Sequence, residues 1–300
     1  MEQNAATTTG PMRWMRALRA FSFPLSVMPV LVGTAAVVPP ARWRWDVLAA
    51  AMLLVLCLHS AGNLLNDYFD YVSGVDSREE EDASRPGRLL VRGDMSPGEV
   101  LAEALVCLGL GAVVGAFLLW RCGPELLWFI VPGAIGLYAH TGPPLKFKSR
   151  GLGELLMLVV FGPLLVGGAA WAQVGAFPPH LVLLSIPVGM VTTAVLAGNN
   201  LRDYEEDGAA GVRTLARIIG WRAYRWVYVG LVAGQAVGVA LYGLLGPASP
   251  VLGAAPLLLL LIRPTISRVW RGQRIPDVDV KTTQYGTTLM AFLLLVLLLD

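Results

Sequence analysis

The sequence predicts an all-α protein that crosses a membrane about nine times, with its helices arranged around a central cavity. Three observations lead to this fold class: the composition, the spacing of apolar stretches and the distribution of basic residues. Hydrophobic residues make up 55% of the 300-residue chain and charged residues only 15%. A soluble domain carries about 25% charged residues because its surface faces water. The composition therefore excludes a soluble protein, and lipid is the expected outer solvent.

Apolar stretches long enough to cross a membrane recur along the whole chain. A spanning helix needs about 20 apolar residues, which most of the stretches reach, while the eighth is shorter. The first stretch is longer than the roughly 7–15 apolar residues of a cleaved signal peptide, so we interpret it as a retained helix. The predicted spans are, in chain order, 20–39, 47–66, 100–120, 126–142, 152–174, 181–201, 224–246, 248–262 and 284–299.

Basic residues are distributed unevenly between the connections. Of the 23 Lys and Arg residues, 20 lie in the N-terminal tail or after the second, fourth, sixth and eighth spans, and the other three are Arg42, Arg44 and Arg121. Cytoplasmic loops are enriched in Lys and Arg, so we expect a cell (inner) membrane protein with a cytoplasmic N-terminus and an outside C-terminus. The segment Arg263 to Arg274, which contains Trp270, predicts an interfacial helix that contacts anionic lipid.

We expect a single transmembrane domain over residues 1–300, with a flexible cytoplasmic tail at 1–12. Two similar halves are predicted at 13–142 and 151–262, and the helix at 284–299 follows them. The loops after the second, sixth and eighth spans are long and polar. Because long ordered loops usually carry function, the cytoplasmic face is the predicted working face.

A polar stripe marks the end of the second predicted span. His59, Asn63, Asn66 with Asp67, and Asp70 recur every three or four residues, which places them on one face of a helix. Carboxylates are costly beside lipid, so this face is expected to line an interior cavity.

The end of the sixth predicted span repeats the arrangement. Asn199 lies four residues before Asp203, and Asn200, Asp203 and Asp207 share a helix face. Both segments therefore contain Asn-x-x-x-Asp at the predicted cytoplasmic end of a span. Carboxylate and amide oxygens are suitable ligands for Mg²⁺, which proteins normally bind together with substrate phosphates.

Basic residues close to both motifs could take the charge of a diphosphate. A phosphorylated substrate, bridged through Mg²⁺ between the two motifs at the membrane surface, is therefore predicted. An ion-coupled transporter also places carboxylates on helix faces, but it places them near the midplane of the membrane. The candidate diphosphate ligands are Arg85, Arg88, Lys146, Lys148, Arg202 and Arg213.

At these residues the chain resembles the UbiA superfamily of intramembrane aromatic prenyltransferases. Asn66-Asp67-x-x-Asp70 is similar to the first Asp-rich motif of that family, and Asp203-x-x-x-Asp207 is similar to the second. The more specific resemblance is to the MenA-type branch, the 1,4-dihydroxy-2-naphthoate polyprenyltransferases. The passages that carry it are Ser22 to Val30, Asn66 to Asp76, Tyr138 to Glu154 and Asn199 to Leu215.

The resemblance implies transfer of a polyprenyl group from an allylic isoprenyl diphosphate to an aromatic acceptor, with Mg²⁺ as cofactor. For 1,4-dihydroxy-2-naphthoate, the prenyl group would replace the carboxylate and give demethylmenaquinone. Homogentisate, 4-hydroxybenzoate, a porphyrin or a glycerol phosphate are the alternative acceptors. Membrane lipid is an expected partner, nucleic acid is not, and the oligomeric state stays open. The implied Mg²⁺ ligands are Asn66, Asp70, Asp203 and Asp207, with Asp67 as a contributing catalytic residue.

Several further polar residues are candidates for binding the acceptor or supporting the site. His59 also fits a histidine packed between helices, and Glu154 also fits a helix cap. Gly74 stands where many superfamily members have a third carboxylate, which Asp76 could replace. The acidic run from Glu79 to Asp82 is expected to be solvated. The complete set of these candidates is Asn63, Asn199, Asn200, Glu154, Tyr138, His59 and Asp76.

Overall fold

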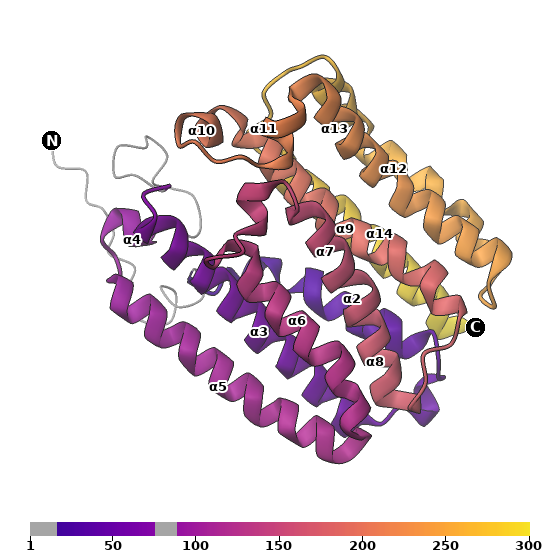
Figure 1. Ribbon diagram of the computed structural model, residues 1–300. Coiled ribbons are helices and arrows are strands. Elements are labelled where there is room, and N and C mark those ends of the chain that lie inside the picture. The colour runs from indigo at the N-terminus through magenta and orange to yellow at the C-terminus, as the bar shows by residue number, and fades with distance from the viewer. Residues whose placement is uncertain (1–16, 76–88) are drawn as a thin grey trace, which may run out of the picture.

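The computed structural model describes residues 17–75 and 89–300, and in these ranges every regular element is a helix (Figure 1). The candidate residues Asp76, Arg85 and Arg88 and the acidic run at 79–82 lie outside the described residues. The helices are α2 (Pro24–Ala35), α3 (Trp45–Val72), α4 (Leu89–Arg92), α5 (Pro97–Cys122), α6 (Leu127–Thr141), α7 (Gly153–Val159), α8 (Leu165–Val174), α9 (His180–Arg202), α10 (Tyr204–Ala209), α11 (Leu215–Ile219), α12 (Trp221–Leu245), α13 (Leu259–Trp270) and α14 (Val278–Leu299).

Each of the nine predicted apolar stretches coincides with a helical segment of the described chain. A π-helical segment (Val160–Leu164) joins α7 to α8, and a 3₁₀ segment (Pro250–Leu258) leads into α13. Within residues 17–75 and 89–300, seven helical segments are long and apolar enough to cross a membrane: α3, α5, 153–174, α9, α12, 250–270 and α14. The two predicted stretches outside this set form α2 and α6, which are shorter.

Three predicted boundaries are wrong, each because a helix continues through polar residues. Helix α3 runs beyond residue 66 to Val72, and the chain then turns at Gly74, whose φ of 75° suits glycine after a helix end. Helix α13 continues to Trp270, so the arginines expected in a separate interfacial helix begin within it. Helix α14 begins at Val278 rather than at 284.

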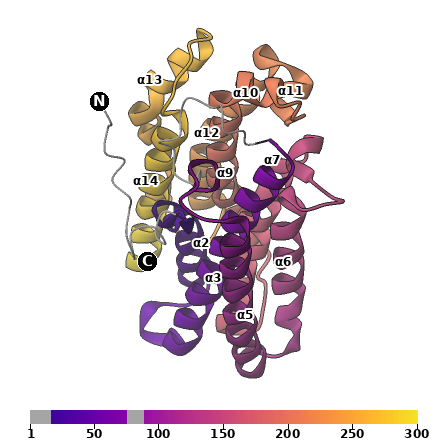
Figure 2. The same cartoon turned by 90° about the vertical axis from the view of Figure 1, so that its left-hand side faces the viewer.

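Helices α10 and α11 lie at one end of the molecule, and the C-terminus lies away from them (Figure 2). Arg44 and Arg121, two of the three basic residues predicted on the side opposite the motifs, contact each other. Arg44 Nη2 donates to the Arg121 carbonyl at 2.9 Å, and Arg121 forms an ion pair with Asp46 at 2.6 Å.

The helices that carry the two motifs hold the bundle together. Helix α3 packs along α5, and α9 packs along α12 and α14, while α2 contacts α3, α8 and α14. Large side chains fill the space between the helices: Leu64 on α3, and Tyr224 and Tyr228 on α12, are fully buried. By contrast, large apolar side chains such as those of Trp120 and Trp128 are exposed, as expected for a surface that faces lipid.

Helix α9 contacts the π-helical segment backbone to backbone. A Cβ atom added at Gly189 would lie 2.5 Å from the Leu158 carbonyl oxygen and 2.9 Å from the Gly162 Cα. Membrane helices use small residues for such close approaches because no hydrophobic effect drives their association within lipid. The glycine pair therefore fixes the position of α9, and with it the position of the second motif.

We expect Gly189→Ala to destabilise the protein, because the added methyl group meets backbone atoms that cannot rotate away. Overpacking of this kind costs about 1–3 kcal/mol, and the thermal unfolding midpoint of the purified protein in detergent measures it. Gly230→Ala is the control, since a Cβ atom at Gly230 meets nothing within 4 Å. If both variants unfold at the same temperature, the glycine contact does not position α9.

Candidate functional site

The first motif occupies the last turns of α3, and its side chains contact the residues that precede α2 and the loop after α6. Asn66 Nδ2 donates to Asp70 Oδ2 at 3.2 Å, which leaves the carbonyl oxygen of Asn66 to serve as an acceptor. Asn63 Nδ2 donates to the Leu18 carbonyl at 3.1 Å. Asp67 is buried and forms an ion pair with Arg19. The predicted polar stripe thus faces other parts of the protein.

Lys148 reaches the first motif from the loop after α6. Its Nζ lies 2.8 Å from Asp70 Oδ2, and both side chains are mostly buried. A short 3₁₀ helix (Phe147–Arg150) places it there, and Lys146, which precedes this helix, has a φ of 43°. The loop predicted to bind a diphosphate therefore brings one of its two lysines into contact with the motif.

The second motif lies at a break between two helices. Helix α9 ends at Arg202 and α10 begins at Tyr204, so Asp203 lies between them. The break is slight, because the Asp207 amide still donates to the Asp203 carbonyl at 2.8 Å. Asp203 and Asp207 therefore stay one helical turn apart, as the sequence pattern predicts, although they do not belong to the same continuous helix as Asn200.

Arg202 contacts carboxylates. Its Nε donates to Asp203 Oδ1 at 2.7 Å and its Nη2 donates to Asp203 Oδ2 at 2.8 Å. Its Nη1 donates to Asp279, which lies in the first turn of α14. The side chain predicted to bind a diphosphate is thus engaged by two acidic groups in this structure.

Charges from both motifs act on Asp207. The pKa of its carboxyl is raised to about 7, chiefly by burial, while Lys148 lowers this pKa and the negative charges of Asp203 and Asp70 raise it. Lys148 and Asp70, at the first motif, are therefore among the charges that act on Asp207 of the second motif. The carboxyl of Asp207 therefore lies where an added cation would favour its charged form.

The donor set fits a hard cation that shares its ligands with a bound anion. Carboxylate and amide oxygens come from both motifs, and Mg²⁺ is usually held by one or two carboxylates plus phosphate oxygens. Within residues 17–75 and 89–300, no three His, Cys, Asp or Glu side chains are close enough to form a complete metal site by themselves. A cation at this place would accordingly need ligands from its substrate.

A buried polar cluster lies on α9 and its neighbours one helical turn before the second motif. Asn200 Nδ2 donates to Glu154 Oε1 at 2.9 Å and to the Tyr224 hydroxyl oxygen at 3.2 Å, and the Tyr224 hydroxyl also donates to Glu154. The cluster joins α7, α9 and α12. Tyr224 was missed by the sequence analysis, because a tyrosine among the apolar residues of a span gives no signal of its hydrogen bonds.

His59 contacts the segment that leads into α2. Ser22 Oγ lies 2.9 Å from its Nε2, and the Ser26 hydroxyl is within hydrogen-bonding distance of its Nδ1. The rings of Phe23 and Phe161 meet it edge to face. These contacts are those of a histidine packed between helices, which was the alternative interpretation of this residue.

The remaining candidates lie near the site without contacting the motif carboxylates. The Tyr138 hydroxyl donates to the Pro143 carbonyl at 2.7 Å, which ties the end of α6 to the lysine-bearing loop. Arg213 is exposed in the turn before α11, and Asn199 is half-buried on α9.

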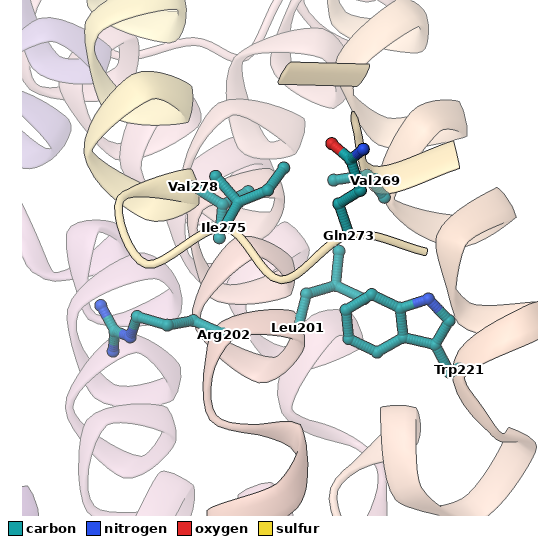
Figure 3. A pocket seen from close by; sticks show the side chains of 7 residues that line it. All are labelled: Leu201, Arg202, Trp221, Val269, Gln273, Ile275 and Val278. Atoms are coloured by element: carbon teal, nitrogen blue, oxygen red, sulfur yellow. The ribbon is translucent and has the colours of Figure 1, made fainter. Parts of the chain in front are cut away.

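The described helices enclose an apolar cavity and border a shallow pocket. An apolar cavity of about 70 Å³ lies between α2, α3, α5, α6 and α8, and its wall includes Val55, Leu58 and Phe129. A shallow pocket lies where α9, α12, α13 and α14 meet, lined by Leu201, Trp221 and Gln273 among others (Figure 3). Arg202 belongs to this second wall, but its side chain extends away from Trp221 (Figure 3).

Comparisons with solved structures show the same fold. A UbiA homolog from Archaeoglobus fulgidus superposes with a TM-score of 0.68 at 15% identity, covering 96% of this chain and 100% of that chain. The structure of a UbiA homolog from Archaeoglobus fulgidus bound to GPP and Mg²⁺ gives a TM-score of 0.67 at 16% identity, with the same coverage. The predicted all-helical membrane fold is thereby confirmed.

Sequence comparisons agree with the structural ones. The chain is 32% identical over 287 residues to UbiA prenyltransferase domain-containing protein 1 of Mus musculus, covering 93% of this chain and 82% of the relative. It is 34% identical over 268 residues to the 1,4-dihydroxy-2-naphthoate octaprenyltransferase of Mycobacterium tuberculosis, covering 87% and 88%. Residues 26–298 match the model of the UbiA prenyltransferase family. The chain therefore belongs to the UbiA prenyltransferase family.

Proposed function

We propose that this member of the family transfers a polyprenyl group from an allylic isoprenyl diphosphate to 1,4-dihydroxy-2-naphthoate in a Mg²⁺-dependent reaction. The observation that carries the proposal is that each of the two Asp motifs, on α3 and at the α9–α10 junction, pairs with a basic side chain: Lys148 with Asp70 and Arg202 with Asp203. The GPP and Mg²⁺ bound to the Archaeoglobus fulgidus homolog support the choice of substrate and cofactor.

The acceptor is proposed on different grounds. The Mycobacterium tuberculosis relative acts on 1,4-dihydroxy-2-naphthoate, and the passages at Tyr138 to Glu154 and Asn199 to Leu215 resemble those of the same branch. Another aromatic acceptor is the second candidate, because the animal relatives are nearly as similar to this chain. The predicted orientation, with the site at the cytoplasmic face of the cell membrane, is part of the proposal.

Residues of both motifs would bind Mg²⁺, and nearby basic residues would bind the diphosphate. Asn66, Asp70, Asp203 and Asp207 would hold Mg²⁺, which when bound neutralises charge on the departing diphosphate. Lys148 would then donate to the same diphosphate, as would the nearby Lys146. The negative charge that develops as the C–O bond breaks is thus met by fixed positive groups, which is how such sites lower the barrier.

The second half of the reaction is the attack of the aromatic ring on the allylic carbon. A bond forms between that carbon and the ring carbon bearing the carboxylate. The bond from this ring carbon to the carboxylate then breaks, the carboxylate leaves as carbon dioxide, and the electron pair of the broken bond restores the aromatic ring. An allylic cation is destroyed by water, so the reaction needs a site that excludes it. The apolar helices around the motifs provide such surroundings.

Alanine at Asp70 or at Asp203 should abolish Mg²⁺-dependent prenylation by the purified protein. Removing one group that stabilises a developing charge costs about 100-fold or more in rate, and a radiolabelled isoprenyl diphosphate assay measures the loss. Asp46→Asn serves as the control, because Asp46 lies in the first turn of α3, at the other end of this helix from the motif, and pairs with Arg121 in the last turn of α5. Full turnover by the Asp70 or Asp203 variant would refute the assignment of the motifs.

Deletion of the gene should remove menaquinone from the source organism and leave a pool of unprenylated naphthoate. The quinone profile of the deletion strain, analysed by mass spectrometry, tests the choice of acceptor. Complementation by the intact chain, but not by the Asp70→Ala variant, controls for secondary mutations. Unchanged menaquinone in a strain without a second such enzyme would contradict the proposed acceptor and leave the prenyl transfer itself untouched.

A further inference from the structure

Asp279 has no role in the sequence pattern, yet the structure connects it to the second motif. It lies in the first turn of α14, and its Oδ2 accepts a hydrogen bond from Arg202 Nη1 across 77 positions of the chain. Its other oxygen, Oδ1, is buried and has no hydrogen-bond partner. A buried carboxylate oxygen without a donor is costly, so the pairing with Arg202 is the contact that favours this arrangement.

The same guanidinium also covers both oxygens of Asp203. Its Nε and Nη2 form two parallel hydrogen bonds to that carboxylate, of 2.7 and 2.8 Å, the geometry in which arginine binds carboxylates most specifically. The side chains of Arg202, Asp203 and Asp279 are only 18%, 24% and 19% exposed. Water therefore screens these charges weakly, and one arginine bridges the second motif to α14.

The packing around the bridge explains why the two helices can approach closely enough. Gly198 lies one turn before Arg202, and a Cβ atom at Gly198 would be 3.3 Å from the Asp279 Cα and 3.4 Å from its backbone nitrogen. The apolar side of the junction is formed by Leu201 and Val278, while Arg202 extends away from Trp221 (Figure 3). The glycine and the apolar wall together direct Arg202 toward both carboxylates.

We propose that Asp279 is a positioning residue that receives Arg202 when Mg²⁺ binds to Asp203. The inference rests on the proposed function, because it assumes that Asp203 is a metal ligand. A metal ion that approaches Asp203 would meet the Arg202 guanidinium on both carboxylate oxygens, and two cations on one carboxylate repel each other. Metal binding would therefore weaken the pair of Arg202 with Asp203, and a buried guanidinium without an anionic partner would be strongly unfavourable.

Asp279 removes this penalty because it offers a second carboxylate that Arg202 already contacts. The arginine stays beside the site, where it can meet the negative charge of a diphosphate after the metal has replaced it on Asp203. Without the charge of Asp279, Arg202 would depend on Asp203 alone and would compete with the metal more strongly. Asp279 thus sets the metal affinity of the second motif without touching the metal.

The test is metal binding by the full-length protein in detergent, measured without any prenyl substrate. Mn²⁺ is the probe. It is titrated into protein that has been loaded with inorganic pyrophosphate, and its binding is followed by electron paramagnetic resonance. Asp279→Asn keeps the shape of the side chain and removes its charge, so we expect the dissociation constant for Mn²⁺ to rise about tenfold, the effect of roughly one charge-assisted contact.

Asp277→Asn is the matched control for this variant. Asp277 lies two residues earlier, is about half exposed, and pairs with Lys281 of its own helix at 2.9 Å. Its loss should leave Mn²⁺ binding unchanged. A tenfold effect of the control would show that charge near the start of α14 acts at long range, and would overturn the assigned role of Asp279.

A double variant separates positioning from general destabilisation. Once Arg202 is also replaced, no guanidinium competes for Asp203, so Asp279→Asn combined with Arg202→Gln should bind Mn²⁺ more tightly than Asp279→Asn alone when the two are compared without pyrophosphate, an anion that Arg202 could itself contact. Equally weak binding by the double variant, or normal binding by Asp279→Asn alone, would refute the proposal. Asp203→Ala distinguishes a failure of this inference from a failure of the proposed function. If the Asp203→Ala variant binds Mn²⁺ normally, the proposed metal site fails as well.

Discussion

The structure depends on how carboxylates are stabilised at the ends of apolar helices. Asp67 and Asp70 lie at the end of α3, and Asp203 lies at the end of α9, where little water reaches them. Each of the three forms an ion pair with a basic side chain: Arg19, Lys148 and Arg202, respectively. Because a buried charge is tolerated only when it is paired, these contacts decide which segments must meet at this end of the bundle.

The same pairs give the site its chemical character. The carboxylates and the basic side chains of such a site can exchange partners when a metal ion and a diphosphate bind. The carboxylates then bind the metal, and the basic side chains bind the phosphate oxygens. The net charge of the site then changes little on binding, which limits the desolvation cost of a highly charged ligand. The buried cluster of Glu154, Asn200 and Tyr224 connects α7, α9 and α12 next to the second motif.

Much of this could be predicted because the underlying patterns are local. Membrane-spanning stretches follow from composition, and the stripes on α3 and α9 follow from the helical period, so the fold class and the family were confirmed. The assignments of individual motif residues are proposals, which the ion pairs of Asp70 with Lys148 and of Asp203 with Arg202 support. The predicted ends of the helices that reach Val72 and Trp270 were wrong, because a helix can continue through polar residues once other segments provide partners for their side chains.

The sequence by itself determined that the chain is a helical membrane protein and which two segments carry its clustered amides and carboxylates. These properties depend on the kinds of residues and on their spacing within one helix. Only the tertiary structure decided which cation meets which carboxylate, that His59 packs against Ser22 and Ser26, and that Asp279 shares Arg202 with Asp203. Such partners lie up to 78 positions apart, and their meeting depends on close helix crossings such as that of Gly198 with Asp279, which no local pattern encodes.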